Sequence, residues 1–321
     1  MTLRIGIVGA GNMAGVHAGG WEVAHDRVVA VFDSDRDRAS KLAADHGASV
    51  AEDFEDLAAM VDVVDICTPT HTHVGYVTAA AQAGVDIVCE KPLARTGPEA
   101  FDAIEVCEMA GVRLLVGHVL RFFPEYVAAR DIAVAGDVGD VGVMRLDRST
   151  YLPAGAAAWF TDRPKSGGVV YDLMIHDVDY ARWVAGDVER VYARSASGGD
   201  HVLATLRHTS GAITHIQGSW AYPRGSFRAT LEIAGSDGLI QRHAASSFIA
   251  SVEAQGEVAD VPEPPSSSAE SPYVTEIRHF SAVLRGEAEP TVTALDGAKA
   301  VAVCDAIEES IATNRAIEVT P

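Results

Sequence analysis

The chain has 321 residues, which is long for a single hydrophobic core and comfortable for two domains. Its formal charge is −20, carried by 45 acidic and 25 basic residues. Such a surface repels phosphate backbones and anionic lipid, which argues against nucleic acids and membranes as partners. No apolar run approaches the roughly 18 residues that a membrane span needs, and the first residues lead directly into a predicted strand, so we expect a cytoplasmic protein.

Roughly the first 120 residues alternate between short apolar runs and stretches with helical spacing. Five apolar runs predict buried strands, at Leu3–Val8, Val28–Phe32, Val63–Cys67, Ile87–Cys89 and Leu114–Gly117. The stretches between them predict helices, among them Arg36–His46, Val74–Ala83 and Glu99–Ala110. Strands without polar alternation, each followed by a helix, predict a doubly wound α/β domain with a parallel sheet.

The pattern changes after Phe123. Further helices are predicted at Asp172–Val184, Tyr273–Arg285 and Ala294–Ala312. One strand is predicted at Met144–Thr150. Residues 190–243 then predict successive strands, among them Val202–Arg207, Ala212–Trp220, Arg228–Ile233 and Leu239–Arg242, and the Gly-Ser or Gly-Asp turns between several of them indicate an antiparallel meander. Pro262–Pro272 is rich in proline and serine and predicts a linker. We expect a nucleotide-binding domain at residues 1–121 and a substrate-binding and oligomerisation domain at 122–321, with the last helices able to pack back on the first domain.

A glycine-rich loop separates the first predicted strand from the first helix. It reads Gly9-Ala10-Gly11-Asn12-Met13-Ala14. Gly9 permits a tight turn, Gly11 lets the backbone approach a pyrophosphate, and Ala14 keeps the helix close to the sheet. The helix N-terminus adds N–H groups and a partial positive charge, so this loop, including Asn12 and Met13, is predicted to bind a dinucleotide.

Asp33 ends the second predicted strand, about 20 residues past the glycines, where a carboxylate accepts both ribose hydroxyls. A carboxylate there repels a 2′-phosphate, which favours NAD over NADP. Arg36 and Arg38 follow closely and offer charge that would neutralise a phosphate, although surface charge on a helix also accounts for them. NAD is therefore the expected cofactor, and NADP the alternative.

Lys91 follows the fourth predicted strand, in the motif Glu90-Lys91-Pro92. Ligands of doubly wound domains bind beyond the carboxyl ends of the strands, so Lys91 is expected in the cleft where a nicotinamide would lie. An ammonium there can polarise a substrate oxygen and donate a proton. The proline restricts the local backbone and allows a cis peptide bond.

A second polar cluster lies in a predicted helix. Asp172 and His176 are four residues apart, which places them on one helix face. A neutral imidazole can accept the proton of a substrate hydroxyl, while Asp172 would bind substrate hydroxyls or orient the histidine. A surface hydrogen bond also explains such a pair, and Asp179 is expected to have a structural role. No set of histidines, acids and cysteines has convincing metal-ligand spacing, and packing or capping accounts for His17 and His118.

These motifs together resemble the Gfo/Idh/MocA family (glucose–fructose oxidoreductase, inositol dehydrogenase and rhizopine catabolism), and the resemblance covers nearly the whole chain. Four further segments match, namely Thr68-Pro69-Thr70-His71-Thr72-His73, Ala83-Gly84, Arg121-Phe122-x-Pro124 and Thr291–Ser310. The resemblance implies an N-terminal Rossmann domain and a C-terminal α+β domain with a large open, mostly antiparallel sheet. It also implies a homodimer or homotetramer formed through that sheet.

The resemblance further implies roles for individual residues. Lys91, Asp172 and His176 would form the catalytic group, in which either Lys91 or His176 would be the acid/base. Cofactor contacts would come from the glycine loop, Asp33, Arg38, Thr68, Pro69, His73, Glu90 and Lys91. Arg121, Tyr151 and Trp159 would join the catalytic group in contacting substrate.

The expected activity is hydride transfer between NAD(P) and a hydroxyl or carbonyl carbon of a sugar, inositol or related polyol. Two alternatives remain open at this point. One is an NAD-dependent glycosidase that oxidises a sugar transiently and eliminates the aglycone. The other is a regulatory protein that binds NAD(P) without catalysis. The individual substrate does not follow from the sequence, because specificity depends on loop geometry.

Overall fold

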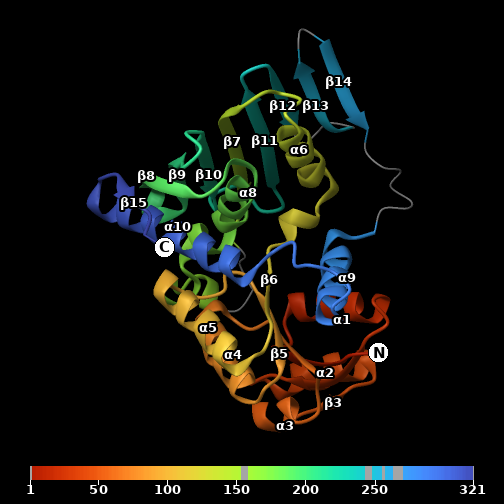
Figure 1. The fold of residues 1–321 in the computed structure, drawn as a ribbon. Helices are drawn as coiled ribbons and strands as arrows, with labels where there is room; N and C mark the ends of the chain where they lie inside the picture. Colours follow the sequence, from red (N-terminus) through yellow and green to blue (C-terminus); the bar gives the residue numbers. More distant parts are fainter. Residues whose placement is uncertain (1, 153–157, 243–247, 255–256, 263–269, 321) are drawn as a thin grey trace. The chain divides into compact units, whose positions relative to one another are not determined.

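The computed structural model describes residues 2–152, 158–242, 248–254, 257–262 and 270–320 (Figure 1). The chain divides into two compact units, which are described separately. Unit 1 consists of Met1–Phe122 with Glu270–Ala298, and unit 2 of Phe123–Ala269 with Lys299–Pro321. A segment from the last sixth of the sequence therefore belongs to the N-terminal unit.

Unit 1 contains a six-stranded parallel sheet with the strand order β3-β2-β1-β4-β5-β6. Its strands are β1 (Arg4–Val8), β2 (Arg27–Phe32), β3 (Ser49–Val50), β4 (Val63–Ile66), β5 (Asp86–Glu90) and β6 (Leu114–Gly117). The order reverses between β1 and β4, and ligands of open parallel sheets bind outside the carboxyl ends at such a reversal. The predicted doubly wound domain is confirmed, and the bounds of the five longer strands agree with the prediction to within one residue.

The helices of unit 1 are α1 (Asn12–Val23), α2 (Arg36–His46), α3 (Phe54–Ala58), α4 (His73–Gln82), α5 (Gly97–Ala110) and α9 (Pro272–Leu284), with 3-10 turns η1 (Thr70–Thr72) and η2 (Val119–Phe122). The bounds of α2 match the prediction because its ends are encoded locally. The Asp35 carboxylate caps its first turn, accepting hydrogen bonds from the backbone N–H of Asp37 and of Arg38. Gly47 ends it in the left-handed conformation with φ of 66°.

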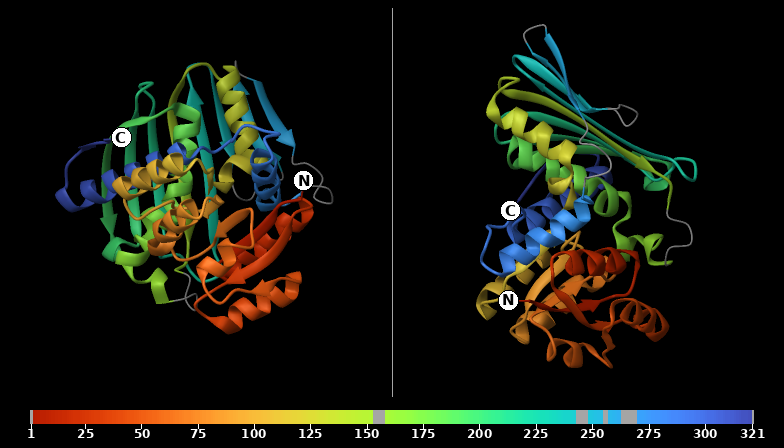
Figure 2. Two further views of the ribbon diagram at one scale, coloured as in Figure 1. Left: turned by 60° about the horizontal axis from the view of Figure 1, so that its bottom comes forward. Right: turned by 90° about the vertical axis from the view of Figure 1, so that its right-hand side faces the viewer.

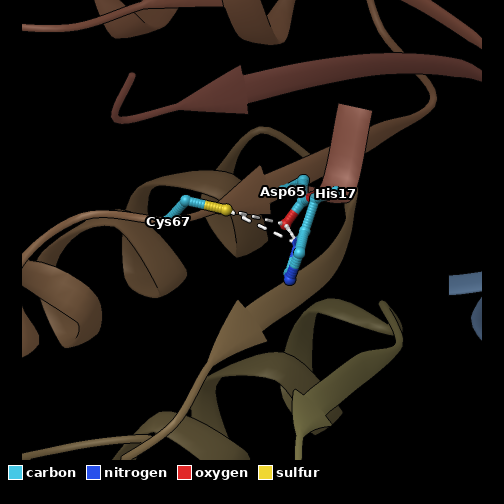
Figure 3. A group of neighbouring side chains, drawn as sticks. All are labelled: His17, Asp65 and Cys67. Carbon is cyan, nitrogen blue, oxygen red and sulfur yellow. Dashed lines mark hydrogen bonds and ion pairs between the residues drawn. The ribbon is translucent and has the colours of Figure 1, made fainter. Parts of the chain in front are cut away.

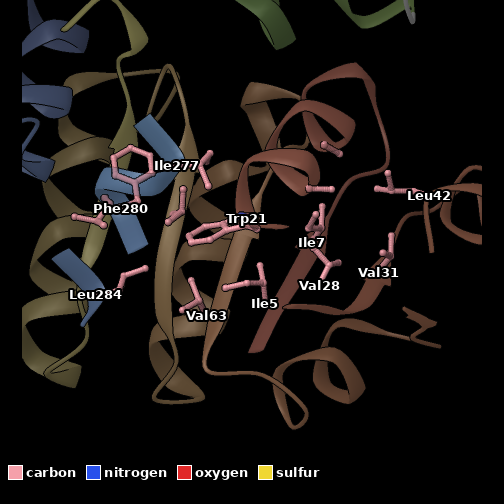
Figure 4. Packing of buried hydrophobic residues seen from close by; sticks show 14 of the residues in the cluster. Ile5, Ile7, Trp21, Val28, Val31, Leu42, Val63, Ile277, Phe280 and Leu284 are labelled. Atoms are coloured by element: carbon pink, nitrogen blue, oxygen red, sulfur yellow. The ribbon is translucent and has the colours of Figure 1, made fainter. Parts of the chain in front are cut away.

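The core of unit 1 is completed by α9, which packs on α1. Figure 4 shows Trp21 of α1 between sheet residues such as Val63 and the α9 residues Ile277 and Phe280. The two helices approach closely because Gly20 faces Ile277, and a Cβ at Gly20 would lie 2.9 Å from the Ile277 Cβ. The buried positions of α9 recur every three or four residues, as expected for a helix with one face on a core.

A buried carboxylate adds polar contacts to this packing. Asp26, which is 3% exposed, accepts hydrogen bonds from Leu3 N (2.8 Å) and from Ser281 Oγ of α9 (2.6 Å). Its Oδ1 also accepts one from the Arg285 guanidinium (2.5 Å), directly after α9. One side chain thus joins the start of the chain to a helix about 255 residues later.

Unit 2 contains a nine-stranded sheet with the order β14-β13-β12-β11-β7-β10-β9-β8-β15. Its strands are β7 (Val141–Thr150), β8 (Val188–Ala196), β9 (His201–His208), β10 (Ile213–Ser219), β11 (Phe227–Gly235), β12 (Gly238–Arg242), β13 (Phe248–Ala254), β14 (Glu257–Pro262) and β15 (Ile317–Glu318). The sheet is mostly antiparallel, as predicted, but the simple meander is wrong. β7 lies between β10 and β11 and pairs in parallel with β10 and antiparallel with β11. The consecutive strands β10 and β11 are therefore not neighbours, as a meander would require. Residues 263–269 of the predicted linker lie outside the described part of the chain.

Helices of unit 2 cover one face of this sheet. They are α6 (Pro124–Ala135), α7 (Arg163–Ser166), α8 (Ile175–Ala185) and the later part of α10 (Ala294–Thr313), with short turns η3 (Ala158–Phe160), η4 (Val170–Met174) and η5 (Ser197–Gly199). Figure 2 shows α6 and α8 on the same face, with no described helix of unit 2 on the other. Beneath α8, the buried Arg148 guanidinium donates to both Asp177 oxygens, at 2.8 and 2.9 Å, and to the Tyr126 hydroxyl. Among the described residues, no helix is long and apolar enough to cross a membrane.

We expect Asp26→Asn to destabilise unit 1 by about 2–3 kcal/mol, because the amide removes the charge that binds Arg285 and keeps only one acceptor oxygen. Thermal or urea unfolding followed by Trp21 fluorescence, with the other tryptophans replaced, would measure the loss. Asp45→Asn is the matched control, since Asp45 is an exposed carboxylate of the same unit. Equal unfolding midpoints for the two variants would contradict the assigned role of Asp26.

Candidate active site

The glycine loop has the geometry that a dinucleotide requires. Gly9 has φ of 93°, and a Cβ there would lie 2.8 Å from the Cys67 carbonyl oxygen, so only glycine fits. Gly11 precedes the first residue of α1 and faces open space, with no atom within 4 Å of a built Cβ. No described side chain caps this 12-residue helix, so its first N–H groups face the loop and suit a pyrophosphate.

Asp33 lies at the end of β2, beside this loop. Its Oδ2 accepts a hydrogen bond from Ala10 N (2.6 Å), and its Oδ1 accepts one from Asp35 N (2.7 Å). The Arg38 guanidinium, half exposed on α2, donates to the same Oδ1 at 3.1 Å. Asp33 therefore holds the glycine loop in place and carries a negative charge at the position where the sequence predicts ribose contacts.

The His73 ring lies between backbone carbonyl groups of the segments that follow β4 and β5. It is 1% exposed, and its ring nitrogens lie 2.7 Å from Pro92 O and 2.8 Å from Thr68 O. Burial lowers the pKa of this imidazole, although both carbonyl groups favour protonation. The structure does not favour a direct cofactor contact by His73, because its ring is enclosed and directed at protein. Thr68 and Pro69 remain half-exposed at the carboxyl end of β4, where the cofactor prediction places them.

Lys91 directly follows β5 and is half-buried, at the same edge of the sheet as the glycine loop. The Lys91–Pro92 peptide bond is cis, as the sequence allows. Glu90, 8% exposed, accepts a hydrogen bond from Lys91 N at 2.9 Å. The Glu90 carboxylate is thus directed into the protein, so we assign it to the support of Lys91 and not to cofactor contact.

A buried polar group lies beneath this edge, and sequence reasoning missed it. His17 Nδ1 is 3.0 Å from both Asp65 oxygens, His17 Nε2 is 3.1 Å from Glu90 Oε1, and Trp21 Nε1 donates to Asp65 at 2.7 Å. Figure 3 shows His17 of α1 against Asp65 and Cys67 at the end of β4. The signal in the sequence was a carboxylate inside the apolar run Val63–Cys67, where an unpaired charge is costly.

His17, Asp65 and Cys67 are also close enough to hold a metal ion, with ligand atoms within 4.8 Å of one another. The hydrogen bonds favour a different interpretation. The His17 nitrogen that faces the group is already bonded to Asp65, and burial, followed by the Asp65 charge, raises the pKa of the Cys67 thiol to about 12. Both ring nitrogens of His17 are already held by carboxylates, Nδ1 by Asp65 and Nε2 by Glu90, so we describe the group as a hydrogen-bonded ion cluster.

In unit 2, Asp172 and His176 occupy the start of the long helix. Asp172 lies in the π-helical turn η4 and His176 in the first turn of α8, so the predicted regular α-helix is wrong at this point. Between residues 166 and 182 these two side chains are half-exposed and all others are buried. Two polar groups are therefore the accessible ones on an otherwise buried segment, and π turns are frequent at functional sites. Asp179 is fully buried, in keeping with the structural role expected for it.

The other predicted substrate residues differ in accessibility. Tyr151 is 36% exposed at the end of β7, and the half-exposed Trp159 stacks on Phe160 with ring centroids 4.1 Å apart. Arg121, in contrast, is 4% exposed and donates to Thr291 O (2.9 Å) and Asp296 Oδ2 (3.4 Å), all within unit 1. The structure does not favour substrate binding by Arg121, because its guanidinium is buried against the segment that leads into α10.

Comparison with known proteins identifies the family to which the chain belongs. A family model described as an oxidoreductase family with an NAD-binding Rossmann fold matches residues 3–118, and the GFO/IDH/MocA C-terminal domain matches residues 126–241. Inositol 2-dehydrogenase of Rhizobium meliloti (strain 1021) is 30% identical over 99% of this chain and 100% of its own length. The chain belongs to the GFO/IDH/MocA oxidoreductase family.

Other members of the family are similar over nearly their full length. 1,5-Anhydro-D-fructose reductase of Ensifer adhaerens is 29% identical over 98% of each chain. The structure of levoglucosan dehydrogenase in complex with NADH and L-sorbose has a TM-score of 0.91 at 22% identity, covering 100% of both chains, which establishes the fold. The N-terminal unit of this GFO/IDH/MocA protein is thus an NAD-binding domain, and the glycine loop and Asp33 fit that cofactor.

We expect Asp33→Ser to weaken NAD binding by about tenfold or more and to reduce the preference for NAD over NADP, because the substitution removes a charge-assisted acceptor and releases Arg38 to contact a 2′-phosphate. Titration of nucleotide against protein fluorescence would give both dissociation constants. Asp37→Ser is the control, since it removes an exposed carboxylate of the neighbouring helix α2. An unchanged ratio of the NAD and NADP constants would remove Asp33 from cofactor choice.

Proposed function

We propose that the protein is an NAD-dependent dehydrogenase or reductase that transfers a hydride between the nicotinamide and a CH–OH or carbonyl carbon of a sugar, inositol or related polyol. One observation carries the proposal. Lys91, one of four lysines in the chain, is held at the carboxyl edge of the parallel sheet that also bears the glycine loop. That edge binds ligands in doubly wound domains. Relatives named for inositol and for an anhydro sugar support the substrate class.

The proposed catalytic group comprises Lys91 of unit 1 with Asp172 and His176 of unit 2. Bound NAD supplies the hydride acceptor in the oxidative direction. His176 accepts the proton of the substrate hydroxyl, and the Lys91 ammonium stabilises the negative charge that develops on the same oxygen. Asp172 hydrogen-bonds a neighbouring substrate hydroxyl or orients His176. In the reductive direction the same groups return the proton to the carbonyl oxygen.

Aromatic side chains fit a polyhydroxylated substrate. Tyr151 and Trp159 offer apolar ring faces to the C–H surface of a sugar, while charged groups bind its hydroxyls. The net charge of −20 disfavours strongly anionic substrates. We therefore place neutral sugars and inositols ahead of sugar phosphates.

The test is NADH absorbance after the protein is mixed with NAD and a panel of inositols, aldoses and polyols. We expect one class of compound to give NADH, and we expect Lys91→Met to lower kcat by about 100-fold or more while NAD still binds, because the charge on the substrate oxygen is no longer stabilised. Lys41→Met is the control, since Lys41 is an exposed lysine of α2. Turnover retained by Lys91→Met would exclude Lys91 from the mechanism. Sugar released from a glycoside without net NADH would indicate the glycosidase alternative.

We further propose that the protein is a cytoplasmic homodimer or homotetramer joined through the open face of the unit 2 sheet. Side chains on this face alternate with buried ones along β8, β9 and β10, and they include three exposed apolar residues, Tyr192, Leu203 and Ile213. Leu203 is 60% exposed. Together with Tyr192 and Ile213 it gives this sheet face exposed apolar surface, and such surface is typical of protein–protein interfaces.

We expect Leu203→Glu to dissociate the assembly at micromolar concentration, because the carboxylate would lose its hydration in the interface. Sedimentation velocity would measure the mass, and far-UV circular dichroism would verify that the variant is folded. Val134→Glu is the matched control, since Val134 is an exposed apolar residue of α6 and does not lie on this sheet face. A monomeric native protein, or no change in mass for Leu203→Glu, would contradict this interface.

A further inference from the structure

We propose that His17 is a positioning residue for Lys91. As a buried imidazolium between Asp65 and Glu90, it holds the Glu90 carboxylate where that carboxylate accepts the backbone N–H of Lys91. The inference rests on the proposed function, because Lys91 is the residue it serves. It adds a role for a side chain that lies outside the proposed catalytic group.

The hydrogen-bond geometry determines the protonation of the ring. His17 Nδ1 faces both oxygens of Asp65 at 3.0 Å, and His17 Nε2 faces Glu90 Oε1 at 3.1 Å. Both neighbours are carboxylates and act as acceptors when ionised. A neutral imidazole has one N–H and would leave one of these contacts without a proton, whereas an imidazolium donates in both directions.

The charges in the group favour the same state. Asp65 and His17 are fully buried and Glu90 is 8% exposed, so two neighbouring carboxylates would be strongly unfavourable without a cation between them. Burial is the largest single effect on the pKa of His17 and lowers it, but the charges and hydrogen bonds of Asp65 and Cys67 together outweigh burial and raise this pKa well above its ordinary value. Burial would likewise raise the pKa of Glu90, but the hydrogen bond and charge of His17, followed by the Lys91 charge, lower it.

The second oxygen of Glu90 connects this group to the proposed catalytic residue. Glu90 Oε2 accepts a hydrogen bond from Lys91 N at 2.9 Å, while Oε1 is held by His17. On the far side of the cis bond, His73 contacts Pro92 O at 2.7 Å. Two buried histidines therefore hold the short segment that carries Lys91: His17 acts before Lys91 through Glu90, and His73 acts after it through Pro92.

The position of His17 in the chain gives the contact a further role. His17 lies on α1, the helix whose N-terminus faces the glycine loop, five residues after the helix begins. The interaction of His17 with Glu90 consequently ties the cofactor-binding helix to the strand end that bears Lys91. A side chain that served packing alone would require the same volume but neither the charge nor the two opposed acceptors.

The first test examines the unmodified protein. Isotope-labelled histidine and NMR would report the protonation of His17 at a pH about one unit above 6.5, the ordinary histidine value. We expect signals of protons on both ring nitrogens of His17. His46, which pairs with Glu22 near the surface, provides the reference signals of a histidine outside the buried group. A neutral His17 under these conditions would overturn the proposal. This measurement does not depend on activity or on any variant being folded.

The second test uses the pH profile of kcat in two variants. His17→Gln removes a positive charge near Lys91, which should raise the apparent pKa of the Lys91-dependent limb, whereas Glu90→Gln removes a negative charge and should lower it. We expect shifts of roughly 0.5–1 unit in opposite directions and a fall in kcat of about tenfold, with a smaller change in KM for NAD. His46→Gln is the matched control. The titratable groups that face His17 are the carboxylates of Asp65 on β4 and Glu90 on β5 and the protonated thiol of Cys67, which follows β4.

The outcomes separate the two proposals. Wild-type profiles in both variants, or shifts in the same direction, would overturn the role of His17 even if the enzyme oxidises sugars as proposed. Absence of NADH formation with every sugar and polyol in the native protein would instead reject the proposed function. The NMR result for His17 would still decide whether the buried imidazolium exists.

Discussion

The chemistry of unit 1 depends on the parallel alignment of β1, β2, β4 and β5, since parallel strands end at one edge of their sheet. Each strand places one functional group there, namely the glycine loop after β1, Asp33 after β2, Thr68 and Pro69 after β4, and Lys91 after β5. The reversal of strand order between β1 and β4 leaves room for a ligand at that edge. Backbone geometry thus brings together residues that are up to about 80 positions apart in the sequence.

Buried polar groups hold the loops that follow these strands in place. Asp33 holds the glycine loop through Ala10 N, His73 joins the β4 and β5 ends through two carbonyl groups, and Glu90 holds Lys91 N. All of these contacts are between side chain and backbone. Such contacts constrain main-chain position more tightly than a surface ion pair, because the backbone group has no rotamers to lose. The site is therefore preorganised by residues that themselves need not touch substrate.

Most of the fold was predictable from the sequence because its signals are local. The apolar runs of β1, β2 and β4, and the cap Asp35 with the stop Gly47 for α2, are contained in short windows. The position of β7 between β10 and β11 was not predictable, since it depends on pairing between residues about 70 to 94 positions apart. The π turn at Asp172 was missed for a related reason, because one residue inserted into a helix leaves the sequence pattern nearly unchanged.

The site was predictable for residues that stand in motifs, and less so for those defined by their neighbours. Lys91 and Gly9 were identified by their positions after strands, whereas the partners of Arg121 and His73 become known only when distant segments meet. Asp65 gave a signal, a charge within an apolar strand, but its partner His17 lies 48 residues earlier and on a helix. Sequence reasoning thus pointed to the half-exposed Lys91 but did not distinguish it from the buried Arg121 and His73, and it missed the contact of His17 with Asp65.

The packing of α9 on α1 has a consequence for how the protein is made. Helix α9, residues 272–284, covers Trp21. One side of the core of the N-terminal unit is therefore exposed until most of the chain has been synthesised. During translation, the ribosome must release Phe123–Ala269 of unit 2 before Ile277 and Phe280 can close that core. The nascent NAD-binding unit would expose apolar surface during this time, and chaperone binding to partial chains would be concentrated on the face of α1 that α9 later covers.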